Sequence, residues 1–210
     1  PRRGEVGPVG FMRQGSRRLI DIDRCPIASE SINAALPNLK AELRKTPPKR
    51  GGTLLLRDSV DGVITDMRAN AELDVLGVRF RFVAGGFFQN NLHILPSFVE
   101  HVVDAARSQG ATHLVDAYCG AGLFALCAAP HFDTIVGIEV SAGAIALAEH
   151  NAQTNDVQHA KFIAADAAAV FEKVTSAPAH TALIVDPPRA GCSPDFLAQV
   201  AAFRPQTLVY

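Results

Sequence analysis

The chain has 210 residues, of which 48% are apolar and 20% charged, and its formal net charge is −1 at pH 7. A chain of this length and composition can bury a substantial core, which excludes a disordered protein. We expect no signal peptide and, because no apolar run approaches the ~20 residues that cross a bilayer, no membrane partner. The four cysteines form no C-x-x-C pair, which argues against a metal site and favours reduced thiols inside the cell, in the cytoplasm or nucleus.

The first part of the chain, residues 1–95, is expected to be a smaller strand-rich α+β region. A helical pattern at 31–45 is expected to be interrupted near Pro37, because proline lacks the N–H that a helix bond requires. Residues 46–52, rich in proline and glycine, predict a loop. Three pairs of strands are predicted, around Gln14-Gly15-Ser16, Val60-Asp61-Gly62 and Gly77.

Basic residues gather in this first part. Residues 1–80 contain 14 Lys/Arg against 10 Asp/Glu, whereas residues 81–210 contain 6 against 11. Such clusters can neutralise phosphates and position an RNA, but an ordinary solvated face has the same composition, and both interpretations stay open. The clustered residues are Arg13, Arg17, Arg18, Arg24, Lys40, Arg44, Lys45, Lys49 and Arg50.

From residue 96 to residue 210 the pattern alternates between helix and strand. Strands joined by helical crossovers indicate an α/β fold with a doubly wound parallel sheet, whose ligands bind at the carboxyl ends of the strands. We therefore expect residues 96–210 to form a second, ligand-binding domain. Helices are predicted at 97–109, 122–129, 141–154, 167–174 and 194–203, and strands at 113–117, 134–139, 160–164, 182–186 and 206–210.

The most informative motif of this domain is VDAYCGAGLF at residues 115–124. An apolar strand runs into a glycine turn and a small-residue helix, and Glu139 closes the next strand. Glycines let a backbone approach a ligand closely, and an acid at the second strand tip can accept hydrogen bonds from both ribose hydroxyls. The motif predicts a nucleoside-cofactor pocket without naming the cofactor, since residues 120–125 also fit the G-x-G-x-x-A dinucleotide pattern.

Two further motifs narrow the choice of cofactor. Residues 182–191 read ALIVDPPRAG, and residues 80–91 read FRFVAGGFFQNN. Together with the glycine turn they resemble the S-adenosylmethionine-dependent RNA uracil-C5 methyltransferases, most of all the eukaryotic enzymes that make 5-methyluridine in tRNA. The resemblance implies a Rossmann-like class I methyltransferase fold, S-adenosyl-L-methionine as cofactor and tRNA as partner. An NAD-dependent oxidoreductase and a non-catalytic cofactor- or RNA-binding domain remain as alternatives.

The resemblance also assigns roles to residues at the strand ends. Tyr118 and the two glycines of the turn would surround the methionine part of the cofactor, Glu139 would bind the ribose, and Asp166 would face the adenine amino group. Each has a structural alternative, because glycines suit any turn and both acids could cap helices. Leu123 stands where the family often has Asn, so one polar contact is lost or replaced. The expected cofactor-binding residues are Gln89, Tyr118, Gly120, Gly122, Glu139, Asp166 and Asp186, with Pro187 and Arg189 on the substrate side.

The resemblance further implies a covalent mechanism. A cysteine thiolate adds to C6 of the uracil, C5 then takes the methyl group, and a base removes the C5 proton so that the thiol can leave. The family's nucleophilic cysteine and general-base glutamate would both follow Tyr210, so we expect no catalytic residue within this chain. We also expect the chain to be a truncated part of the enzyme and to be monomeric. A cytosine-C5 enzyme ranks lower, because its cysteine would stand in place of Arg189.

Overall fold

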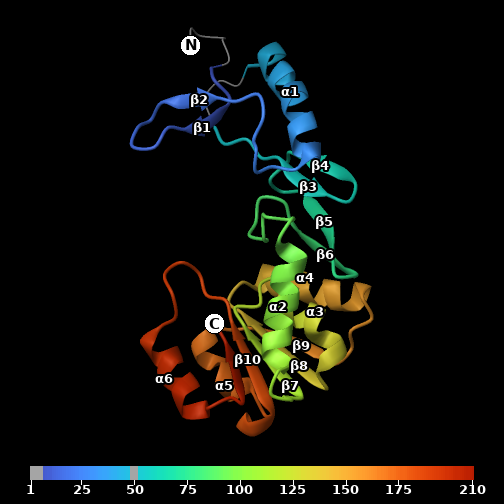
Figure 1. Ribbon diagram of the computed structural model, residues 1–210, viewed down its shortest axis with the longest axis vertical. Helices are drawn as coiled ribbons and strands as arrows, with labels where there is room; N and C mark the ends of the chain where they lie inside the picture. The colour runs from blue at the N-terminus through green and yellow to red at the C-terminus, as the bar shows by residue number, and fades with distance from the viewer. Residues whose placement is uncertain (1–6, 48–51) are drawn as a thin grey trace. The chain divides into compact units, whose positions relative to one another are not determined.

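The computed structural model describes residues 7–47 and 52–210 and shows two compact units (Figure 1). One unit comprises Pro1–Ala71 with Val83–Gly85, and the other comprises Glu72–Phe82 with Gly86–Tyr210. The domain boundary predicted between residues 95 and 96 stays a prediction. Of the predicted loop at 46–52, residues 48–51 lie outside the described part of the chain.

Two small antiparallel sheets form in the described residues of the first unit. Gly15 has a φ of 70° and Gly62 a φ of 116°, left-handed conformations that glycine adopts without strain. These glycines allow the chain to reverse, and both hairpins predicted in this region are confirmed. The paired strands are β1 (Gly10–Met12) with β2 (Leu19–Asp21), and β3 (Arg57–Ser59) with β4 (Gly62–Ile64).

Helix α1 (Glu30–Lys45) runs through Pro37 without a break, so the interruption predicted there was wrong. Its first turn is capped by Ser29, whose hydroxyl accepts a backbone N–H at 3.2 Å. Two buried side chains, Asn33 and Lys40, hold the helix to the preceding segment on either side of the proline and offset the bond that proline lacks. Asn33 bonds Cys25, Ala28 and Ser29, and Lys40 bonds Asp21, Ile22 and Asp23.

The second unit is built on a five-stranded sheet in which every neighbouring pair of strands is parallel. The strand order is β11-β10-β7-β8-β9, so the chain builds outward from β7 in one direction and then crosses back to build in the other. This is the predicted doubly wound arrangement. The strands are β7 (His113–Ala117), β8 (Thr134–Glu139), β9 (Ala160–Ala164), β10 (Thr181–Val185) and β11 (Thr207–Val209).

Helices cover both faces of this sheet (Figure 1). Val115 and Ala117 join an apolar cluster with Phe196 of α6, whereas Asp116 between them bonds α3, because successive side chains of a strand point to opposite faces. The prediction of one continuous helix at 167–174 was wrong, because a 3₁₀ turn there precedes a short α-helix. The helices are α2 (Leu95–Arg107), α3 (Leu123–Ala128), η1 (Ala129–His131), α4 (Ala142–Thr154), η2 (Ala167–Ala169), α5 (Val170–Lys173), η3 (Pro178–His180) and α6 (Pro194–Phe203). Within the described residues, none has the length and apolar content that crossing a bilayer requires.

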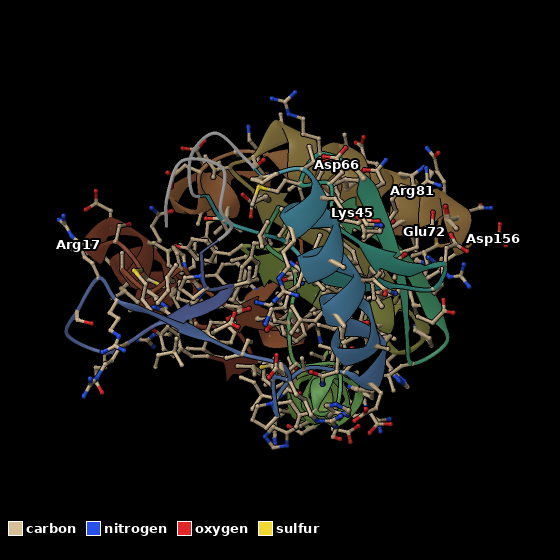
Figure 2. The ribbon with its side chains drawn as sticks, turned by 90° about the horizontal axis from the view of Figure 1, so that it is seen from above. Arg17, Lys45, Asp66, Glu72, Arg81 and Asp156 are labelled. Atoms are coloured by element: carbon tan, nitrogen blue, oxygen red, sulfur yellow. The ribbon has the colours of Figure 1, made fainter. Side chains whose placement is uncertain are left out.

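A hairpin precedes the sheet in the chain, as the pattern around Gly77 predicted. Phe82 is buried in it, and its ring stacks on that of Phe88 with 4.2 Å between centroids. On the other side of the strands, the Arg81 guanidinium donates to the Glu72 carboxylate at 2.7 and 2.9 Å (Figure 2). The strands are β5 (Asn70–Val75) and β6 (Val78–Val83), whose residues 72–82 belong to the second unit.

Candidate functional site

Predicted site residues from three loops meet at the carboxyl edge of the sheet. Strand β7 lies between β8 and β10, and the order of the strands reverses there. The glycine turn follows β7, Glu139 is the last residue of β8, and Asp186 directly follows β10. Open α/β sheets bind their ligands at such a reversal, so the topology itself marks this edge as the candidate site.

The turn after β7 places Tyr118, Gly120 and Gly122 in the left-handed region, with φ of 68°, 54° and 88°. Because Tyr118 has a large side chain, this conformation is strained and the surroundings must hold it. A Cβ at Gly122 would approach Leu126 and Phe162 to 3.2–3.3 Å, so the tight packing and the left-handed φ together favour glycine there. A Cβ at Gly120 would meet nothing within 4 Å, so the space beside Gly120 is open to a ligand.

The Glu139 carboxylate is bonded to the turn and to the start of α4. Its Oε2 accepts the N–H of Gly120 at 3.3 Å, and its Oε1 accepts the N–H of Ser141 at 2.9 Å. The N-cap of α4 is Ser141, whose hydroxyl accepts the N–H of Ala144 at 3.3 Å, so Glu139 does not fill that position. A carboxylate has about four lone-pair positions, so both oxygens can still accept a ligand's hydroxyls.

The Tyr118 side chain connects the turn to other loops at this edge. Its ring meets the ring of Phe196 edge-on, with 5.8 Å between centroids, and its hydroxyl lies near the Cys192 thiol. Burial, with smaller effects from that thiol and from the charge of Asp166, raises the pKa of Tyr118 to about 12. The phenol therefore stays neutral, next to residues that follow β9 and β10.

Asp166 and Asp186 occupy the ends of β9 and β10, and both are exposed to solvent. The backbone carbonyl of Asp166 accepts the N–H of Ala169 at 2.9 Å and so closes the turn of η2. Partial burial of the Asp186 carboxyl raises its pKa. Both acids thus lie at the solvent-facing rim of the sheet edge.

The remaining predicted residues lie on two connecting segments. Pro187 and Arg189 belong to the loop between β10 and α6, where the N–H of Gly191 donates to the carbonyl of Pro188 at 2.8 Å. Gln89 is half-buried in the segment after β6. Within the described part of the chain, no hydrogen bond joins Gln89 to the other predicted residues. The roles of these three side chains stay predictions.

Asp116 is a functional candidate that the motifs did not single out. It is fully buried in β7, where Oδ2 accepts the N–H of Ala125 at 3.0 Å and Oδ1 has no partner among the described residues. Burial raises the pKa of Asp116 to about 8, and the charges of Asp186 and Glu139 act in the same direction. An acid inside the apolar run His113–Ala117 was the available signal, because carboxyls are seldom buried without a partner.

Two of the three thiols described in the second unit are unreactive. Cys119 and Cys127 are buried, and burial raises the pKa of both, that of Cys127 to about 12. Both stay protonated at neutral pH, and a protonated thiol is a poor nucleophile. Cys192, in the loop after β10, is half-buried beside the Tyr118 hydroxyl.

Some basic residues of the first unit are engaged in ion pairs. Lys40 is buried and lies within 3.2 Å of both Asp21 and Asp23, and Arg24 pairs with Glu30. Buried Lys40 holds the fold together and Arg24 already has an anionic partner, which favours the structural interpretation for both. The predicted cluster members Lys49 and Arg50 lie outside the described residues.

The β1–β2 hairpin carries exposed cations and exposed apolar side chains together. Arg17 lies at its turn (Figure 2), with Arg13 and Arg18 close to it in the sequence. None of these three arginines forms an ion pair with a described residue. The strands expose Phe11, Met12, Leu19 and Ile20. This combination suits a polyanion with flat apolar groups, such as RNA.

Comparison with known proteins identifies the family. The sequence model described as tRNA (Uracil-5-)-methyltransferase matches residues 64–210, more than half of the chain. The chain therefore belongs to the tRNA (uracil-5-)-methyltransferase family, and the predicted resemblance is confirmed.

Two curated fungal relatives are similar over most of the chain. The tRNA (uracil(54)-C(5))-methyltransferase of Schizosaccharomyces pombe is 38% identical over 226 residues, which cover 100% of this chain and 43% of the relative. The protein of the same name from Saccharomyces cerevisiae is 34% identical, over 93% of this chain and 38% of its own length. The chain thus spans less than half the length of these relatives.

A solved structure confirms the fold class. The tRNA (uracil-54, C5)-methyltransferase of Pyrococcus abyssi, in complex with S-adenosyl-L-homocysteine, superposes with a TM-score of 0.75. The match covers 96% of this chain and 62% of that chain at 20% identity. At this identity the likeness establishes the shared methyltransferase fold, which agrees with the parallel sheet described above.

The buried carboxyl of Asp116 should make stability fall as the pH rises. Its pKa is about 8 in the folded chain and near the ordinary 3.8 when unfolded, so between these values the folded state holds the extra proton. Across that window the free energy of unfolding should fall by up to about 1.4 kcal/mol per pH unit, and this effect should level off above it. Urea unfolding of the unmodified chain and of Asp116→Asn should show that the variant lacks this component. Identical pH profiles would contradict the buried proton.

Proposed function

We propose that the chain binds S-adenosyl-L-methionine at the carboxyl edge of its sheet, as the cofactor-binding part of a tRNA uracil-C5 methyltransferase. The observation that carries the proposal is the bond from Gly120 to Glu139 at the point where the strand order reverses. It places an acceptor for ribose hydroxyls beside open space in the glycine turn. Family membership supports this choice of cofactor over a nicotinamide.

Each part of the cofactor has a partner in this proposal. The carboxylate oxygens of Glu139 accept the two ribose hydroxyls, in charge-assisted hydrogen bonds. The turn at Gly120 surrounds the methionine part, with the Tyr118 side chain next to it, and Asp166 accepts the adenine amino group. The remaining assigned residues are Gln89, Gly122 and Asp186 on the cofactor side, and Pro187 and Arg189 on the uracil side.

The proposed reaction transfers the methyl group to C5 of a uridine in tRNA. Uracil C5 is too electron-poor to attack the sulfonium methyl directly, so a thiolate must first add to C6 of a base swung out of its stack. Cys119 and Cys127 are unsuited to this role because they are buried and protonated. Following the family resemblance, we place the nucleophile and the general base outside residues 1–210. A covalent adduct of this chain with tRNA containing 5-fluorouridine would contradict that placement.

Calorimetric titration with S-adenosyl-L-homocysteine tests the proposed site. Glu139→Gln keeps the size of the side chain but removes its charge, so affinity should fall by about 5- to 150-fold, equivalent to ~1–3 kcal/mol. Glu149→Gln, at an exposed position of α4, is the matched control and should bind as the unmodified chain does. Preferential binding of NAD would overturn the proposal in favour of an oxidoreductase.

We also propose that the β1–β2 hairpin contacts the tRNA backbone. If Arg13, Arg17 and Arg18 each neutralise a phosphate, replacing one with Gln should lower the slope of log affinity against log salt by about one. Filter binding of tRNA at several salt concentrations measures this slope. Arg24→Gln is the control, because Arg24 already pairs with Glu30, and it should leave the slope unchanged. Equal slopes for all variants would return these arginines to an ordinary solvated face.

A further inference from the structure

Asn151 of α4 and Asn155, the C-cap of that helix, hold strand β6 by its backbone. The side-chain oxygen of Asn151 accepts the N–H of Arg81 at 2.8 Å, and its amide donates to the Arg81 carbonyl at 3.1 Å. Asn155 repeats the arrangement with the N–H and carbonyl of Arg79, at 2.8 and 2.7 Å. The two side chains thus bond this edge of β6 as a neighbouring strand would.

The geometry of the two elements explains why these bonds fit. Four residues of a helix rise about 6.0 Å, and two residues of a strand span about 6.7 Å. Positions i and i+4 share one face of a helix, and every second residue of a strand directs its backbone groups to the same edge. Asn151 faces Arg81 and Asn155 faces Arg79, so the pairs agree in both spacing and side. The helix and the strand run in opposite directions.

Of the two asparagines, Asn151 also reaches the glycine turn. Its amide donates a further bond to the carbonyl of Ala121 at 3.0 Å, whereas the amide of Asn155 donates to the carbonyl of Asn151 at 2.7 Å. The peptide that follows Ala121 is held at its other side as well, because the N–H of Gly122 donates to the carbonyl of Cys119 at 2.8 Å. That peptide plane is therefore fixed from both sides, and Asn151, only 1% exposed, supplies one of the two bonds.

We propose that Asn151 is a positioning residue of the cofactor pocket, an inference that rests on the function proposed above. The turn includes left-handed Tyr118, so its shape requires support from outside the turn. Asn151 ties that shape to β6, and the stacking of Phe88 on Phe82 ties β6 to the segment that carries Gln89. The buried side chain of Asn151 thus connects the glycine turn with the segment that carries Gln89, the two segments assigned to the cofactor.

Isosteric variants separate this role from a general contribution to stability. Asn151→Asp keeps an acceptor for the N–H of Arg81 but loses its donors, which leaves a carboxylate facing the Ala121 carbonyl. Asn155→Asp loses the equivalent bond to β6 and is the matched control, because Asn155 makes no bond to the turn. We expect both variants to melt at lower temperature, but only Asn151→Asp to bind S-adenosyl-L-homocysteine about tenfold or more weakly in calorimetry.

The outcomes distinguish this inference from the function on which it rests. If the unmodified chain does not bind S-adenosyl-L-homocysteine, the proposed function fails, and with it the pocket that Asn151 would position. If the unmodified chain binds and both variants keep its affinity, or both lose affinity equally, Asn151 is a structural residue only.

Amide hydrogen exchange on the unmodified chain gives a second test that needs no variant. Bound S-adenosyl-L-homocysteine should protect the side-chain amide protons of Asn151 more than those of Asn155, and equal protection would overturn the inference.

Discussion

The hydrogen bonds that keep the glycine turn left-handed are the interactions on which the rest of the site depends. Strand β7 delivers the chain to the sheet edge, but Tyr118 follows it in a conformation that costs roughly 1–2 kcal/mol for a residue with a side chain. The bonds that hold the turn include those from Gly120 to Glu139, from Gly122 to Cys119, and from Asn151 to Ala121. The first and the last of these bonds connect the turn to β8 and α4, whereas the bond from Gly122 to Cys119 is internal, so the shape of the turn depends on β8 and α4.

The same edge holds a carboxyl group that works against stability. Asp116 is buried, with one oxygen that has no partner in the described part of the chain, and a neutral apolar side chain in its place would avoid that desolvation. A destabilising group inside the core, in the strand that leads to the open turn, is the pattern expected where a fold carries a binding function. Asp166, exposed after β9, has no such cost, because water solvates it.

Much of the second unit could be predicted from the sequence, because buried parallel strands are continuous apolar runs between glycines and prolines. Strands β7, β8 and β9 have the predicted bounds. The position of Glu139 at a strand tip was predictable for the same reason. Sequence patterns could not reveal the role of Asn151, since its bonds to Arg81 and Ala121 connect residues far apart in the chain. They also missed the continuity of α1 through Pro37, where buried anchors outweigh a local preference.

A crystal structure of the chain grown with S-adenosyl-L-homocysteine is the most direct test of the central claim, that the turn between β7 and α3 is a cofactor site. The account predicts the ribose hydroxyls within hydrogen-bonding distance, about 2.5–3.0 Å, of the Glu139 carboxylate, and the homocysteine part beside Gly120. Ligand bound elsewhere on the chain, with Glu139 bonded only to Gly120 and Ser141 as it is here, would contradict it.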